Sequence, residues 1–147
     1  YKFAFVRNPY ERLVSCWYSK VVLERYNTGT NSFFDKCKGF EFDDFVNYVC
    51  EHHSNNSSIN PHVSSQLSLF PHNLVDTVIK LENFEVSMDR LCSKINLTDW
   101  RKKIKILNDT KQYREHYTDY YSYTSQQLVA KLYEQDLSTL GYKFDEY

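Results

Sequence analysis

The sequence lacks the features that would direct its interpretation at once. Its 147 residues carry a formal net charge of only −1, so the total charge gives no reason to expect nucleic acid or an acidic membrane as a partner. No apolar run is long enough to span a bilayer, and no signal peptide is visible. Any anion-binding site must therefore be local, and the length suits one domain or a large part of one.

Cysteine and metal-ligand patterns are also sparse. The four cysteines show neither a CxxC pair nor the spacing of metal ligands: Cys16, Cys37, Cys50 and Cys92. An even count permits two disulfides, but a chain of this size with a real core does not need them, so reduced and buried thiols are an equal expectation. No other residues form a metal-ligand set, and we expect no metal.

Aromatic residues, by contrast, are abundant. The chain has 13 Tyr and 10 Phe, and hydrophobic residues make up 41% of it, which is enough to bury a core. Such rings would suit a sugar-binding surface. A tyrosine-rich core, with hydroxyls that find partners at its edges, is the simpler interpretation.

Apolar periodicity predicts strands that alternate with helices. Two β-prone runs predict buried strands, and apolar residues at helical spacing predict helices. The expected strands are residues 2–6 and 75–81, the expected helices 10–25, 42–49, 84–95 and 124–137, and the expected loops 27–39 and 52–61. Thr124 and Gln127 form a capping box for the last helix, and Gly141 marks its stop. Residues 100–123 match no element.

This alternation predicts an α/β fold with a parallel sheet, flanking helices and a helix-rich C-terminal half. Two strands are too few for a complete sheet, and the chain begins at Tyr1, without Met, directly before an apolar run. We therefore expect a single domain, residues 1–147, that is truncated at its N-terminus.

The strongest chemical signal is the segment Arg7–Ser15 (RNPYERLVS). Asn8 is a good N-cap and Pro9 suits a first helical turn, so a strand ends at Arg7 and a helix follows. Ligands of open α/β sheets lie at the carboxyl ends of strands, and a helix N-terminus attracts anions. Arg7 and Ser15 can therefore form a phosphate clamp. Spacing alone equally permits a surface ion pair for Arg7 and a helix-carbonyl hydrogen bond for Ser15.

Residues 3–20 (FAFVRNPYERLVSCWYSK) resemble the 3′-phosphate-binding motif of sulfotransferases that use PAPS (3′-phosphoadenosine 5′-phosphosulfate). The closest resemblance is to the carbohydrate sulfotransferases of family 2, which include chondroitin, dermatan and heparan enzymes. It implies a P-loop-like sulfotransferase fold in which Arg7 and Ser15 hold the 3′-phosphate. Asn8 belongs to the same cofactor-binding set, and Arg12 supports it on the nucleotide or through an internal ion pair.

Weaker similarities to the same family run along the rest of the chain, at residues 62–70, 80–84, 120–121 and 133–142. They imply that His62 and Gln66 lie at the substrate, although a plain loop histidine is an equal interpretation of His62. The family also returns a loop to the nucleotide near Asn108, Thr110 and Lys111, where a solvated charge is the alternative for Lys111.

The resemblance implies transfer of a sulfuryl group from PAPS to a carbohydrate hydroxyl, without a metal. The family's lysine loop for the 5′-phosphosulfate and its catalytic base, a His or Glu, are expected upstream of Tyr1, because no GxxxxGK-like segment occurs here. We therefore expect the chain alone to be inactive. Alternatives are a non-catalytic nucleotide- or glycan-binding module and a small kinase.

The expected partners are the nucleotide donor and a carbohydrate acceptor. A membrane is expected only through a segment outside this chain. The eukaryotic relatives lie in the Golgi membrane and face the lumen, whereas the bacterial ones lack that anchor.

Overall fold

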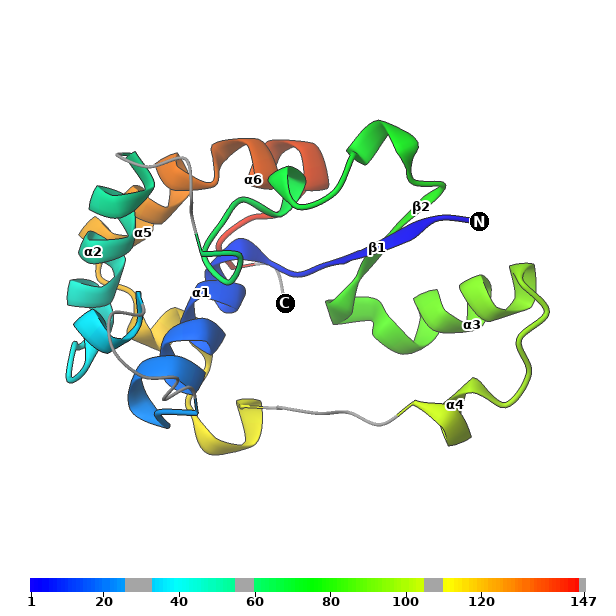
Figure 1. Ribbon diagram of the computed structural model, residues 1–147, viewed down its shortest axis with the longest axis horizontal. Helices are drawn as coiled ribbons and strands as arrows, with labels where there is room; N and C mark the ends of the chain where they lie inside the picture. The colour runs from blue at the N-terminus through cyan, green and yellow to red at the C-terminus, as the bar shows by residue number, and fades with distance from the viewer. Residues whose placement is uncertain (26–32, 55–59, 105–109, 146–147) are drawn as a thin grey trace.

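The computed structural model describes residues 1–25, 33–54, 60–104 and 110–145 (Figure 1). Its strands are β1 (Phe3–Val6) and β2 (Thr77–Lys80). Its α-helices are α1 (Pro9–Trp17), α2 (Phe42–Ser54), α3 (Phe84–Lys94), α4 (Trp100–Lys103), α5 (Tyr123–Leu132) and α6 (Glu134–Leu140). A π-helical turn, η1 (Tyr18–Val22), extends α1, and short 3₁₀ turns are η2 (Asp35–Cys37), η3 (Gln66–Ser68), η4 (His72–Leu74), η5 (Leu81–Asn83), η6 (Lys111–Tyr113) and η7 (Tyr117–Tyr120).

The two strands pair in parallel, with Phe3 opposite Thr77 and Val6 opposite Lys80. Both predicted strands and the parallel sheet are therefore confirmed, in a mixed and helix-rich α/β fold. The expectation that the first strand is buried is correct only for Val6, because Phe3 and Phe5 point to an exposed face. Since parallel strands end at the same edge, the segments after β1 and β2 leave the sheet side by side.

Helices α1, α2 and α5 pack together at one end of the sheet, while α3 runs beside the strands and packs against β2 (Figure 1). The apolar faces of α1, α2 and α5 form the main core, with Leu13 and Val14 from α1, Phe45 from α2 and Val129 from α5 fully or almost fully buried. Burial of such side chains is the main source of stability. The core fixes α1, whose opposite face carries the site described below.

Tyrosines fill this core, as predicted. Tyr117 and Tyr133 are buried, and their hydroxyls donate to the carbonyls of Phe144 and Val63. The hydroxyl of Tyr121 donates to the carbonyl of Tyr10. Each hydroxyl thus finds the partner that a buried phenol requires.

The first predicted helix changes its winding near its end. The N–H of Leu23 donates to the carbonyl of Tyr18 at 2.9 Å, a bond that spans five residues and defines the π turn. Val21 is consequently buried whereas Val22 is exposed, although the helical spacing predicts both on the apolar face. The sequence prediction is wrong here because it assumes a single helical period from 10 to 25.

The C-terminal helix also differs from its prediction. The Ser122 hydroxyl, rather than Thr124, accepts from the N–H of Ser125 at 3.2 Å, so Ser122 is the N-cap and α5 begins at Tyr123. The backbone of Tyr133 departs from helical geometry and separates α5 from α6. Gly141 ends α6 with a φ of 64°, as predicted, because glycine adopts this left-handed conformation without strain.

Other expectations are resolved in part. Residues 27–32 and 55–59 of the predicted loops lie outside the described residues, while α2 extends through 52–54. The unassigned segment 100–123 contains α4, η6 and η7. All four cysteines are free thiols. None of the helices in the described ranges is long and apolar enough to cross a membrane, and the described side chains form no cluster of three or more potential metal ligands.

Candidate functional site

A cavity of about 660 Å³ opens along the face of α1 and η1. Its described lining residues are Arg7, Arg12, Ser15, Cys16, Ser19, Lys20, Arg25, Pro61 and His62. Four of these side chains are cationic and two are serine hydroxyls, and no carboxylate is among the described lining residues. A concave surface with one sign of charge concentrates ligands of the opposite sign, so this cavity suits an anion.

Arg7 is placed at the cavity by a side-chain clamp on its backbone. The N–H of Arg7 donates to Oε1 of Gln66 at 2.9 Å, and Nε2 of Gln66 donates to the carbonyl of Arg7 at 2.8 Å. The next N–H, of Asn8, donates to Oε1 of Glu82 at 2.6 Å. Both backbone units at this corner are therefore fixed by side chains from distant segments, which leaves the guanidinium of Arg7 to face the cavity.

Gln66 is itself held by a buried carboxylate. Asp136 of α6 is fully buried and accepts from the Ser65 hydroxyl at 2.6 Å, the N–H of Gln66 at 2.7 Å and the N–H of Leu67 at 3.1 Å. These donors lie at the start of η3, where backbone N–H groups lack internal partners. Asp136 thus fixes η3, η3 fixes Gln66, and Gln66 fixes Arg7.

Arg12 connects the cavity to the segment that carries His62. Its guanidinium donates to the carbonyls of Ser64 at 2.6 Å and Pro61 at 2.7 Å. The sequence predicts that Arg12 contacts the nucleotide or forms an internal ion pair; the observed partners are backbone carbonyls. Arg12 therefore keeps its positive charge at the cavity while it anchors the wall that contains His62.

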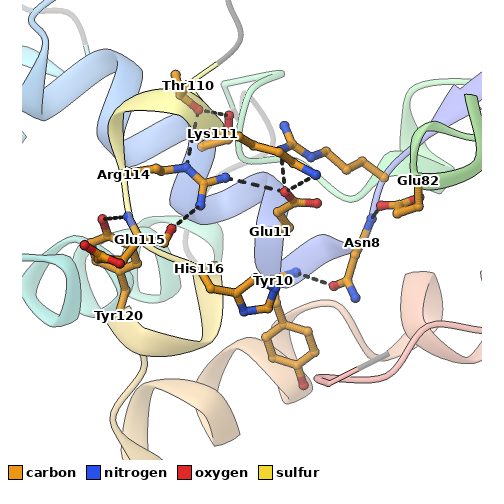
Figure 2. A network of polar contacts seen from close by, with 12 residues as sticks. Asn8, Tyr10, Glu11, Glu82, Thr110, Lys111, Arg114, Glu115, His116 and Tyr120 are labelled. Atoms are coloured by element: carbon orange, nitrogen blue, oxygen red, sulfur yellow. Dashed lines mark hydrogen bonds and ion pairs between the residues drawn. The ribbon is translucent and has the colours of Figure 1, made fainter. Parts of the chain in front are cut away.

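Three cationic side chains, including that of Arg7, contact one carboxylate oxygen of Glu11. Its Oε1 lies 2.8 Å from Arg7 Nη2, 2.9 Å from Lys111 Nζ and 3.5 Å from Arg114 Nη2. Figure 2 shows Lys111 and Arg114 reaching Glu11 from the segment that faces α1. Burial would raise the pKa of Glu11, but the hydrogen bonds and charges of Arg7 and Lys111 lower it to about 2. Glu11 therefore stays ionised and fixes the Arg7 side chain.

Ser15 lines the cavity, and its hydroxyl contacts Thr110. Its Oγ is 3.1 Å from Oγ1 of Thr110, and Nε of Arg114 donates to the same Thr110 oxygen at 3.4 Å. Each hydroxyl has one donor and two acceptor sites, so either Ser15 or Thr110 can donate in this contact. When Thr110 donates, the O–H of Ser15 can point toward an anion. The alternative prediction, a hydrogen bond from Ser15 to a helix carbonyl, is not the observed contact.

The structure brings together some predicted site residues and separates others. Arg7, Arg12, Ser15 and His62 line one cavity. Asn8 is fully buried, where it accepts from the N–H of Tyr10 and donates to the carbonyl of Lys143, so it shapes the corner without reaching the cavity.

The remaining predicted residues act from outside the cavity wall. Gln66 is occupied by the backbone of Arg7, as described above. Lys111 lies on the other side of Glu11 and is half exposed, in a smaller hollow that it shares with Arg114. Asn108 lies outside the described residues.

The surroundings of His62 in this cavity change the pKa of its imidazole. Desolvation, then the charges of Lys20 and Arg12, lowers the pKa of His62 below its ordinary value of 6.5. The imidazole is therefore mainly neutral near pH 7, a form in which one ring nitrogen is a hydrogen-bond donor and the other an acceptor.

Of the described cavity residues that carry a cation or a hydroxyl, sequence reasoning missed three, namely Ser19, Lys20 and Arg25. The spacing of Arg12, Ser15 and Ser19 could have revealed Ser19, since residues three and four apart share a helix face. Lys20 had no such signal, because the π turn sets its direction. Asp136 lies within the family similarity at residues 133–142, and its long-range role has no local signature.

Comparison with known protein families identifies the family of the chain. A model described as the Sulfotransferase family matches residues 1–143, which is nearly the whole chain. Searches of curated proteins and of solved structures found no match. The chain therefore belongs to the sulfotransferase family.

Proposed function

We propose that this chain binds the 3′-phosphate end of PAPS within a sulfotransferase that sulfates a carbohydrate hydroxyl. The observation that carries the proposal is the cavity on α1, which Arg7 and Ser15 both line and which has no carboxylate among its described lining residues. PAPS as donor and a carbohydrate as acceptor rest on the resemblance of the motif at residues 3–20, and so does a P-loop-like fold.

The residues present fit a phosphate monoester. A guanidinium donates two parallel hydrogen bonds to phosphate, and charge-assisted bonds of this kind are the strong ones. Arg7 already uses one nitrogen on Glu11, and the guanidinium has further N–H donors for a ligand. Ser15 adds a neutral donor, and Arg12 adds positive charge from the adjacent turn of α1.

In this proposal, the residues of this chain bind the nucleotide donor and orient it. The donor supplies an activated sulfuryl group, whose bond to the leaving phosphate breaks as an acceptor oxygen attacks the sulfur. Arg7, Ser15 and Arg12 fix the nucleotide. His62, neutral and on the opposite wall, contacts donor or acceptor, and Gln66 contributes by holding Arg7 in place. No described residue is assigned as the catalytic base.

Calorimetry with adenosine 3′,5′-bisphosphate tests the donor site. Arg7→Ala should weaken binding about 30-fold, which corresponds to about 2 kcal/mol for the loss of a charge-assisted contact. Arg101→Ala is the matched control. Arg101 lies on α4, far from the cavity, and its Nη1 is 2.7 Å from Oδ1 of Asp89. Equal affinities of the wild type and Arg7→Ala would refute the assignment.

Binding without transfer is a second candidate. It is favoured by the cavity lining, in which four cationic side chains and two serines suit phosphate and no described residue is a carboxylate. Because this chain alone is expected to be inactive, the full-length protein is assayed for transfer of radiolabelled sulfate from PAPS to a mixture of desulfated glycosaminoglycans: labelled product supports the transferase, and tight nucleotide binding without product supports the binding module.

A further inference from the structure

The backbone N–H groups at the start of α1 already have their hydrogen bonds within the protein. Those of Arg7 and Asn8 donate to side chains from distant segments, and that of Tyr10 donates to the Asn8 side chain. Pro9 has no N–H. A helix N-terminus binds anions through such groups, so a phosphate at this corner depends instead on the Arg7 side chain and on its direction.

The peptide group between Arg7 and Asn8 is held at both ends. Its carbonyl accepts from Nε2 of Gln66 at 2.8 Å. Its N–H donates at 2.6 Å to Oε1 of Glu82, which lies beside Asn8 in Figure 2. The orientation of this peptide group sets the ψ angle of Arg7, and the preferred directions of a side chain depend on the backbone that carries it. Glu82 therefore acts on the guanidinium of Arg7 through the backbone.

Glu82 is in turn held by the C-terminal part of the chain. The hydroxyl of Tyr142, a buried residue, donates to Oε2 of Glu82 at 2.9 Å, so each carboxylate oxygen has its own donor. Donors on both oxygens fix the plane of a carboxylate, whereas a single donor leaves it able to turn. Lys80 holds the tyrosine in place, since its Nζ lies 4.1 Å from the centroid of the Tyr142 ring and donates to the carbonyl of Gly141 at 2.9 Å.

The segment Tyr142–Phe144, here called the C-terminal strap, also contacts the start of α1. The carbonyl of Lys143 accepts from Nδ2 of Asn8 at 2.8 Å. The ring of Phe144 packs edge-on against Tyr10, with ring centroids 5.0 Å apart. The strap therefore contacts both the N-cap of α1 and the carboxylate that binds its backbone.

We propose that the C-terminal strap positions the phosphate site and that Tyr142 is a positioning residue. Its hydroxyl orients Glu82, Glu82 orients the peptide group after Arg7, and the guanidinium is thereby directed into the cavity. The inference rests on the proposed donor site and adds to it a segment far along the sequence. A carboxylate near an anion site disfavours the anion by its charge. Glu82 therefore strengthens binding through its position, against the effect of its charge.

Calorimetry of adenosine 3′,5′-bisphosphate with the full-length protein compares the wild type and Tyr142→Phe, each with and without Arg7→Ala. Phenylalanine keeps the ring on Lys80 and removes only the hydroxyl. We expect Tyr142→Phe to weaken binding about fivefold when Arg7 is present and less than about twofold when it is absent, because the effect passes through Arg7. Tyr1→Phe is the matched control and should leave the affinity unchanged, since its hydroxyl contacts Thr77 at the opposite end of the strands.

Glu82 supplies a second pair of variants. Glu82→Ala should weaken bisphosphate binding about fivefold, although it removes a negative charge. Glu82→Gln should keep the affinity within about twofold of the wild type, because its amide offers an acceptor to the N–H of Asn8 and a donor to the hydroxyl oxygen of Tyr142.

The outcomes distinguish this inference from the donor site itself. Wild-type affinity in Arg7→Ala would overturn the donor site. If Arg7→Ala weakens binding, then wild-type affinity in Tyr142→Phe, or an equal loss with and without Arg7, would overturn only the role of the strap. Tighter binding by Glu82→Ala would also overturn it, because charge would then outweigh position. A thermal melt checks that each variant folds, and the Glu82 pair decides the question should Tyr142→Phe not fold.

Discussion

Replacement of Glu11 by glutamine tests whether the negative charge of Glu11 holds the cationic side chains around it in place. Glu11 is buried with a side-chain exposure of 4%, and Arg7, Lys111 and Arg114 converge on its Oε1. Glutamine keeps the shape and removes the charge. The variant therefore asks whether this one carboxylate holds the three cations, and with them the Arg7 side chain, in place.

The magnitude follows from the pKa of Glu11, which falls from 4.5 to about 2 on folding. A depressed carboxylate pKa contributes stability above the unfolded-state value, and this contribution is lost as the pH falls through the folded value. A difference of this size corresponds to about 3 kcal/mol at pH 7 and to about half of that at pH 3. Loss of one partner from a buried ion pair typically costs a similar amount.

Urea denaturation of the wild type and Glu11→Gln at several pH values provides the measurement. The difference in the free energy of unfolding should be about 3 kcal/mol at pH 7 and should shrink between pH 5 and pH 2. Glu115→Gln is the matched control, because Glu115 is exposed in the same segment and its loss should cost less than about 0.5 kcal/mol. A difference that is small at pH 7, or that does not change with pH, would contradict the arrangement around Glu11.

Two further predictions concern the cavity walls. Since Lys20 and Arg12 contribute to lowering the pKa of His62, bound adenosine 3′,5′-bisphosphate should raise it, and NMR titration of the imidazole measures this; an unchanged pKa at saturation would place the anion elsewhere. Asp136→Asn should cost about 2 kcal/mol of stability and also weaken bisphosphate binding several-fold, because η3 no longer fixes Gln66. Ser138→Ala, an exposed change on the same helix, should affect neither, and unchanged affinity in folded Asp136→Asn would show that Asp136 only stabilises the fold.

Local chemistry made part of this fold predictable. Asn8 and Pro9 mark where α1 begins, and Gly141 marks where α6 ends, because capping and left-handed geometry depend on single residues. The two strands were also recognisable from their β-branched and aromatic runs. The break at Tyr133 was not, since residues on both sides of it continue the same helical spacing of apolar side chains.

The residues of the candidate site also divide into those that a short local segment predicts and those whose role depends on long-range contacts. Arg7, Arg12 and Ser15 share one short segment and were predicted from it, and His62 was predicted from its similarity to the family. Gln66 was expected at the substrate, yet its amide matches the backbone of Arg7, 59 residues away. No sequence pattern distinguishes these two uses of a glutamine, because both need one donor and one acceptor on the same planar group.

The dependence of Arg7 on distant contacts has a physical consequence for the site. An arginine at a strand end on a free surface would lose side-chain entropy whenever it bound a phosphate. Here Gln66 fixes its backbone, Glu11 fixes its guanidinium, and Asp136 fixes Gln66, so most of that ordering is complete before a ligand arrives. Preorganisation of this kind raises affinity without any additional contact to the ligand. The long-range contacts that sequence reasoning could not find are therefore the ones that fix the short and predictable motif in the arrangement from which we propose that it binds phosphate.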